Sequence, residues 1–186
     1  MMRNVLLMTA GVLALALVAC GGRENKEQPK ADSVSVKAGR GPLPAERDLM
    51  RENTVQQLGH TFHVAIRRYV DKSLPVVKDE LGQDFYDNKV EVTIQSEGTQ
   101  FFHHTFSKDD FAGFIPIEEL NTYVFLGMAY DDRKADTRDL CLAAQLGQPG
   151  TGEGPAFTIE IPIDGGAFSI VRDTQQETMK QEELGE

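Results

Sequence analysis

The chain has 186 residues, of which 19 are basic and 29 acidic, so its formal net charge is −10 at pH 7. This balance argues against nucleic acid as a partner, because nucleic acid is bound by neutralising its phosphates with Lys and Arg. It argues equally against docking on anionic lipid headgroups, and an acidic surface of this kind keeps a domain solvated and dispersed.

A secretory signal is predicted at residues 1–19. Arg3 precedes a mostly apolar run over residues 5–18, and a positive start before a short apolar core is typical of such signals. The run is too short for a transmembrane helix, which needs about 20 apolar residues. The sequence Leu-Val-Ala-Cys at residues 17–20 resembles the lipobox of bacterial lipoproteins. That resemblance implies a diacylglyceryl group on the sulfur of Cys20 and a further fatty acyl chain, such as palmitate, on its amine.

Cleavage before Cys20 leaves one cysteine to interpret. The cleavage removes one Arg and no acid, so the mature chain carries 18 basic and 29 acidic residues, a net charge of −11. Lipidation consumes Cys20, and Cys141 then has no disulfide partner in the mature chain. Cys141 lies in an apolar run without the flanking glycines of a catalytic turn. We interpret it as a buried thiol that behaves as a small hydrophobe.

Composition divides the mature chain into three parts. Residues 20–47, the lipidated cysteine and a polar segment, contain almost nothing to bury, which predicts a disordered tether. Residues 48–173 form the predicted β-rich domain, in which residues 48–57 are expected to make a short helix. Residues 174–186 are rich in Gln and Glu and are predicted to be a frayed, polar C-terminal tail.

Period-two alternation dominates the predicted domain and indicates strands with one face on the core and one facing water. The alternating apolar positions are Phe62, Val64 and Ile66; Val90, Val92 and Ile94; Phe157, Ile159, Ile161 and Ile163; and Phe168 and Ile170. Two glycine-containing turns, at Glu97-Gly98 and at residues 164–166, predict hairpins between neighbouring strands. A charged turn at residues 131–138 is predicted to join a strand over residues 122–130 to another over residues 139–146.

One stretch breaks this half-buried pattern. Residues 123–130 are apolar on both faces, so a second layer must cover them, and residues 107–120 are the predicted cover. Pro116 limits any helix in that cover to a turn or two. The predicted fold is therefore mainly β: a single antiparallel sandwich or half-open barrel of seven or eight strands with one or two short helical turns.

The spacing of the four histidines does not favour a metal site. They come in two pairs, His60 with His63 and His103 with His104. Neighbouring strand residues point to opposite faces, as do residues three apart, so at most two of the rings converge. Zinc needs more ligands than that, and no acidic residue lies inside either strand to complete the set.

Two acidic runs and the absent motifs point away from catalysis. Residues 79–88 hold oxygen ligands that suit calcium but lack EF-hand spacing, so we interpret them as a solvated loop with Asp87-Asn88 as turn residues. The acids of residues 131–139 are interspersed with Arg and Lys, which favours a salt-bridged turn. No hydrolase signature and no phosphate-binding glycine loop is present.

The best candidate for a binding surface is an aromatic strand. Its residues are Phe101, Phe102, His103 and His104. Adjacent strand residues face opposite ways, so one phenylalanine is expected in the core and the other needs cover or a partner. The alternative is that Phe111, Phe114 and Ile115 cover it and no exposed aromatic surface exists.

Three motifs carry a resemblance to a known family. Residues 78–80 (Lys-Asp-Glu), 85–88 (Phe-Tyr-Asp-Asn) and 104–111 (His-Thr-Phe-Ser-Lys-Asp-Asp-Phe) resemble a family of small uncharacterised lipoproteins from Bacteroides- and Prevotella-type bacteria. The resemblance covers about residues 58–172. It implies an envelope protein of a Gram-negative anaerobe, held in the outer membrane, and it implies no activity, cofactor or catalytic residue. Gly21 after the cysteine is compatible with outer-membrane delivery.

The expected function follows from these features. We expect a lipid-anchored protein of the outer membrane, facing the periplasm or the surface, whose domain binds another envelope component and is not an enzyme. The alternative is a carrier of small apolar ligands whose aromatic side chains line a half-barrel pocket, and an enzyme of unrecognised type is the third possibility. No cofactor and no metal are expected.

Overall fold

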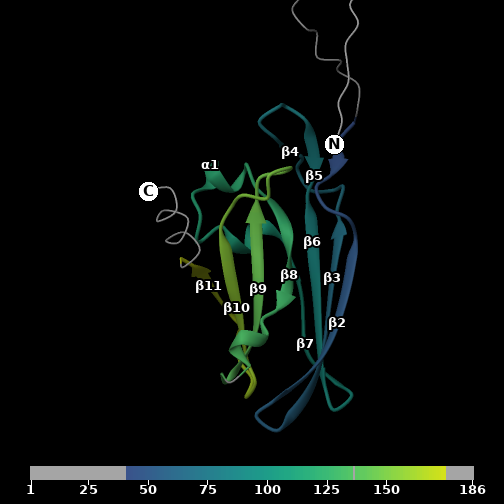
Figure 1. Cartoon of the computed structure of the whole chain (residues 1–186), viewed down its shortest axis with the longest axis vertical. Coiled ribbons are helices and arrows are strands. Elements are labelled where there is room, and N and C mark those ends of the chain that lie inside the picture. Colours follow the sequence, from purple (N-terminus) through teal and green to yellow (C-terminus); the bar gives the residue numbers. More distant parts are fainter. Residues whose placement is uncertain (1–40, 136, 175–186) are drawn as a thin grey trace, which may run out of the picture. The chain divides into compact units, whose positions relative to one another are not determined.

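The computed structural model describes residues 41–135 and 137–174, and two antiparallel sheets dominate this part of the chain (Figure 1). Sheet I has the order β2-β3-β6-β7 and sheet II the order β11-β10-β9-β8. The strands of sheet I are β2 (Leu49–Gln57), β3 (His60–Val70), β6 (Asn88–Ser96) and β7 (Thr99–Phe106). Those of sheet II are β8 (Val124–Tyr130), β9 (Asp139–Gly147), β10 (Ala156–Pro162) and β11 (Ser169–Asp173). The predicted mainly β sandwich is confirmed.

Short elements complete the described structure. A small sheet of order β1-β5-β4 is formed by β1 (Leu43–Pro44), β5 (Asp84–Tyr86) and β4 (Val77–Lys78). The helical turns are η1 (Lys108–Phe111), α1 (Ile117–Leu120) and η2 (Asp132–Lys134). None of the helices within residues 41–135 and 137–174 is long and apolar enough to cross a membrane.

The core lies between the two sheets and is built from the alternating positions. Its large, fully buried side chains include Phe62, Val64, Ile94 and Phe106 from sheet I, and Leu140, Leu142, Leu146, Phe157 and Ile159 from sheet II. Directly opposite residues on paired strands share a face, so the register lines up these apolar residues row by row. Both predicted glycine hairpins are present, between β6 and β7 and between β10 and β11.

The segment predicted as a short helix is a strand, so that prediction was wrong. β2 pairs with β3 along its whole length, from Gln57 opposite His60 to Leu49 opposite Arg68. Leu58 and Gly59 make the connecting turn, both with positive φ (50° and 84°), as a two-residue hairpin turn requires. The first six residues of β2 are exposed, so they carry no apolar alternation from which a strand could be recognised.

The predicted tether also extends too far toward the domain. Leu43–Pro44 pairs in parallel with Phe85–Tyr86 as β1, and the carbonyl of Arg47 accepts two hydrogen bonds from the guanidinium of Arg68. Residues 41–47 therefore belong to the folded domain. The predicted signal, Cys20 and all of the predicted tail except Thr174 lie outside the described residues.

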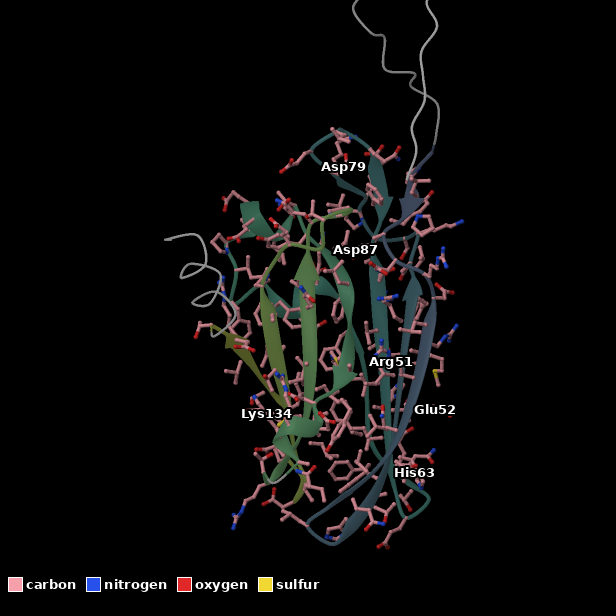
Figure 2. The ribbon with its side chains drawn as sticks, in the orientation of Figure 1. Arg51, Glu52, His63, Asp79, Asp87 and Lys134 are labelled. Atoms are coloured by element: carbon pink, nitrogen blue, oxygen red, sulfur yellow. The ribbon has the colours of Figure 1, made fainter. Side chains whose placement is uncertain are left out.

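A buried polar cluster joins the sheets at one end of the sandwich. Oδ1 of Asp87 accepts hydrogen bonds from the backbone N–H groups of Asn88 (2.8 Å) and Phe125 (2.7 Å). The amide of Asn88 donates to the carbonyl oxygen of Phe125 (2.8 Å). Lys108 Nζ lies 3.3 Å from Asp87 Oδ2 and donates to the carbonyl of Tyr123 (2.9 Å). Figure 2 shows Asp87 at this junction between β6 and β8. We call these three side chains, Asp87, Asn88 and Lys108, the polar junction.

Burial changes the pKa of the carboxyl group in this junction. Desolvation raises the pKa of Asp87, although the N–H of Phe125 and the charge of Lys108 oppose the shift. Asp87 and Asn88 are fully buried, so the sequence interpretation of them as turn residues of a solvated loop was wrong. Asn88 begins the core strand β6, Asp87 immediately precedes it, and both side chains bind the neighbouring sheet.

Lys108→Met tests the junction through its pH dependence. Removing the ammonium leaves the buried Asp87 carboxylate without a cation, which should lower the free energy of unfolding by about 3–5 kcal/mol near neutral pH. A carboxyl whose folded-state pKa is raised stabilises the fold below its unfolded pKa, and that stabilisation is lost as pH rises through the folded value. The deficit of the variant should therefore shrink on acidification from about pH 7 to about pH 5, measured by denaturant titration against wild type.

Lys72→Met is the matched control, because Lys72 is exposed and, among the described residues, makes only a cation–π contact with Tyr86. Its stability relative to wild type should not change over the same pH range. A Lys108→Met deficit that stays constant or grows on acidification would contradict a raised pKa for Asp87.

Candidate functional site

The predicted aromatic strand is β7, and a β-bulge changes how its side chains point. Phe102 pairs with Ile94, and Gln100 pairs with Gln95, which leaves Phe101 as an extra residue. A bulge of this kind breaks the strict alternation of a strand. Both phenylalanines are half-buried and pack against the core. The expectation that they face opposite ways was therefore wrong.

The contacts of these rings are with the core and with one loop residue. Phe101 lies 5.5 Å from Phe62 between ring centroids. Phe102 and His104 lie 5.8 Å and 5.0 Å from Phe168, which belongs to the segment between β10 and β11. The cover over the aromatic strand is thus Phe168.

The segment predicted to cover the aromatic strand covers sheet II. Phe111 packs 5.5 Å from Phe125 and 4.7 Å from Phe157, and Phe114 lies 6.0 Å from Phe157. This agrees with the prediction that residues 107–120 shield the apolar strand β8. It does not agree with the prediction that they shield the aromatic strand.

The histidines are dispersed. His103 lies on the outer face of sheet I, 3.0 Å from the hydroxyl of Thr93, whereas His104 is 3.4 Å from a carboxylate oxygen of Asp110. His63 contacts Thr54, and the ring of His60 lies 6.1 Å from that of its strand neighbour Phe62. Among the described residues, no group of three or more His, Cys, Asp or Glu side chains is placed to hold a metal ion.

The other sequence candidates have structural partners. Asp79 Oδ1 accepts from the N–H groups of Leu81 and Gln83 and closes its own loop. Asp131 caps η2 and pairs with Arg133 at 2.8 Å, which lowers the pKa of Asp131. Burial raises the pKa of the Cys141 thiol, consistent with its interpretation as a small buried hydrophobe.

A cleft that sequence reasoning missed lies beside β2. Sheet I extends past the edge of sheet II at the start of β2, because β8 lies against β3 and β6 and the first six residues of β2 are exposed. The cleft has a volume of about 300 Å³. It is lined by Leu49, Arg51, Ile66, Arg68, Leu126, Gly127, Met128, Ala129, Ala143, Ala144, Gln145 and Ala156. We call it the arginine cleft.

The two arginines of the cleft differ in what they bind. Arg68 is largely buried, with 15% of its side chain exposed, and donates hydrogen bonds to the carbonyls of Leu126 and Arg47. It also pairs with Glu46 at 3.2 Å. A Cβ atom at Gly127 would lie 3.1 Å from Arg68 Nη1, so glycine allows this arginine to approach β8. Arg68 is therefore a structural link between the sheets.

Arg51, in contrast, has a free guanidinium. The register places it opposite Ile66 and so on the core-facing side of β2, but it is exposed. Within residues 41–135 and 137–174 it makes no hydrogen bond or ion pair. Figure 2 shows Arg51 on the side of β2 toward sheet II and its neighbour Glu52 on the opposite side. The cleft therefore combines apolar walls with one cation that can bind an anionic group.

The strand beside the cleft has an open edge. β2 pairs only with β3 in the described sheets, and it contains no proline; its charged residues, Arg51 and Glu52, are of the kind that natural edge strands carry. Such an edge offers backbone groups to an extended partner segment. Sequence reasoning could not locate this site, because it read residues 48–57 as a helix.

Phe101→Ser and Phe102→Ser should both destabilise the domain, because the bulge turns both rings toward the core. Each ring is only half-buried, so we expect a loss of about 2–3 kcal/mol, below the 3–5 kcal/mol typical of a fully buried ring. His103→Ser, on the outer face, should change the free energy of unfolding by less than about 0.5 kcal/mol. Thermal and denaturant unfolding would measure all three. A thermally silent phenylalanine variant would show that one ring faces outward.

A search of curated proteins finds no match to this chain. A family profile described as Domain of unknown function (DUF4738) matches residues 31–169, a span that includes every strand of sheet I and β8, β9 and β10 of sheet II, and ends at the first residue of β11. The chain belongs to this family of domains of unknown function, DUF4738.

Proposed function

We propose that this protein is a lipid-anchored component of the bacterial outer membrane whose domain binds another envelope component without catalysing a reaction. The lipobox-like residues 17–20 support the anchor, and the resemblance to small lipoproteins of Bacteroides- and Prevotella-type bacteria supports the location. The proposal leaves the domain facing the periplasm or the cell surface.

The observation that carries the binding role is the free guanidinium of Arg51 in the arginine cleft. In a chain with a net charge of −10, this arginine occupies a core-facing position yet makes no ion pair among the described residues. An exposed cation beside apolar walls is the combination by which a site selects a carboxylate carried on an apolar segment.

The preferred partner is an extended acidic segment of another protein. Its backbone would pair with the open edge of β2, and its alternate side chains would enter the cleft. Leu49 and Met128 would contact apolar groups of the segment, and Arg51 would bind its carboxylate. Strand addition supplies affinity from the backbone, while the cleft supplies selectivity.

The rival function is a carrier of small ligands, and the same cleft supports it better than the aromatic strand does. A volume of about 300 Å³ is at the small end of ligand pockets. Its apolar walls and single free cation would suit a small apolar anion. The aromatic strand supports the carrier less, because Phe101 and Phe102 are packed against other rings.

Cys20→Ser tests the anchor. The variant should lose metabolic labelling by radioactive palmitate and should no longer fractionate with the outer membrane, because the acylated sulfur is absent. The wild-type protein processed in the same cells is the control. Retention of a lipid-sized mass increment at the N-terminus of the variant would refute the lipobox interpretation.

Photocrosslinking from β2 tests the binding role. A photoreactive residue at Leu49, on the cleft side, should form a discrete protein adduct in intact cells, whereas one at Met50, on the opposite face, should not. Arg51→Glu in the Leu49-labelled protein should reduce this adduct at least about tenfold, because it replaces attraction of a carboxylate by repulsion.

Glu52→Arg provides the matched charge reversal on the opposite face and should leave the adduct unchanged. Neither reversal should alter the melting temperature, since Arg51 makes no described contact that stabilises the fold. Equal adducts from Leu49 and Met50, or insensitivity to Arg51→Glu, would refute the cleft as the binding site. Loss of protein adducts together with retained binding of a small anion, such as octanoate, would favour the carrier.

A further inference from the structure

A second concavity lies on the outer face of sheet II and adjoins the arginine cleft. Its volume is about 510 Å³, and most of its lining comes from residues of η2, β9, β10 and β11. It shares Ala143 and Ala156 with the lining of the arginine cleft. Their neighbours Leu142 and Phe157 are buried in the core, so alternation points both alanines away from it. The two concavities therefore form one continuous hollow, which we call the outer trough.

Small side chains form the floor of the outer trough. Ala143 is paired with Ala129 in β8 and with Thr158 in β10, and Ala156 lies in the next row of the sheet. The side of an antiparallel sheet that faces water usually carries polar side chains. These small side chains instead leave room for a further chain segment to lie across β8, β9 and β10.

The described chain ends at this trough. Asp173, at the end of β11, pairs with Ala156, and Thr174 belongs to the lining of the second concavity. Residues 175–186 follow directly, and twelve extended residues span up to about 40 Å. Three strand spacings of about 4.8 Å separate β11 from β8, the strand that borders the arginine cleft. The remaining chain is therefore long enough to cross the whole trough.

The sequence of residues 175–186, which we call the C-terminal segment, is acidic with two apolar residues. It contains four glutamates and one lysine. Alternate side chains of an extended segment share a face. Glu177, Met179 and Glu183 would thus face one way, and Lys180 and Glu182 the other. One face of the segment therefore presents an apolar side chain between two acids.

Each concavity of the outer trough contains one cation without an ion pair. The Nζ of Lys134, in the second concavity, donates to a threonine hydroxyl of β10 (3.0 Å) and forms no ion pair within the described residues. Asp131 and Asp173 line the same concavity, but both lie near the guanidinium of Arg133. Arg51 is the free cation of the arginine cleft. The trough therefore offers two cations on either side of a floor of small residues, which complements the acidic and apolar face of the C-terminal segment.

We propose that the C-terminal segment docks along the outer trough in an extended form, with Glu177 at Lys134, Met179 over the alanine floor and Glu183 at Arg51. This replaces the expectation of a frayed tail, which rested on composition alone. The docked segment occupies the arginine cleft and competes there with an acidic partner. The competition rests on the proposed function, whereas the docking does not.

Photocrosslinking within the full-length chain tests the docking. In detergent micelles, a photoreactive residue at Met179 should form cross-links to peptides that contain Ala143 or Ala156, identified by mass spectrometry. The same residue at Lys180, on the other face, is the matched control and should give at least about fivefold fewer of these links. In a mixture of isotopically light and heavy chains, each link should join fragments of one label, because the contact lies within a single chain.

Exchange of charges tests the pairing at Arg51. Glu183→Lys should reduce the Met179 cross-links at least about twofold, as expected for an exposed ion pair. Combining it with Arg51→Glu should restore them, because the ion pair re-forms with its signs reversed. Glu182→Lys, on the other face, should leave them unchanged. Equal links from Met179 and Lys180, links between light and heavy chains, or no restoration in the double variant would overturn the docking.

A further arm separates the docking from the proposed function. Glu183→Lys weakens the competitor, so the partner adduct from a photoreactive residue at Leu49 should increase in intact cells. If the Met179 cross-links form as expected but Leu49 gives no partner adduct, the docking is supported and the proposed binding role fails.

Discussion

Sheet II can end at β8 because side chains of sheet I satisfy the backbone of that strand. An edge strand presents unpaired N–H and C=O groups, and buried ones are costly when nothing binds them. Asp87 and Asn88 bind both backbone groups of Phe125, and Arg68 binds the carbonyl of Leu126. These charged and amide side chains supply the hydrogen bonds that a further strand would otherwise make to the backbone of β8.

This way of ending the sheet creates the arginine cleft. With β8 held under β3 and β6, nothing in sheet II lies under the exposed part of β2. Arg51 consequently occupies a position that alternation would assign to the core and yet has space in front of it. Arg68, on the same face of the neighbouring strand, already binds the carbonyl of Leu126 in β8 and the carboxylate of Glu46. One arginine therefore holds the sandwich together and the other is available for binding.

The polar junction is a costly way to hold the two sheets together. Taking Asp87 and Lys108 out of water is costly, and their mutual attraction offsets this only when their remaining hydrogen-bonding groups are satisfied. Oδ2 of Asp87 is not satisfied by the described residues. An apolar core would pack more simply at this point. The junction instead binds both backbone groups of Phe125 and so holds the edge of sheet II against β6.

Local pattern was sufficient for much of the fold. Alternation at positions such as Val90, Val92 and Ile94 predicts a strand with one buried face, and Glu97-Gly98 predicts the turn after it, because each depends only on adjacent residues. The tertiary structure decided the rest. β2 is a strand because β3 pairs with it. The bulge at Phe101 interrupts the regular alternation of side chains that a prediction from sequence has to assume. Asp87 and Asn88 resemble turn residues until Phe125, some 37 residues further along, lies against them. Periodicity therefore determined which face of a strand is buried, but only packing between distant segments determined where the second sheet stops and the cleft begins.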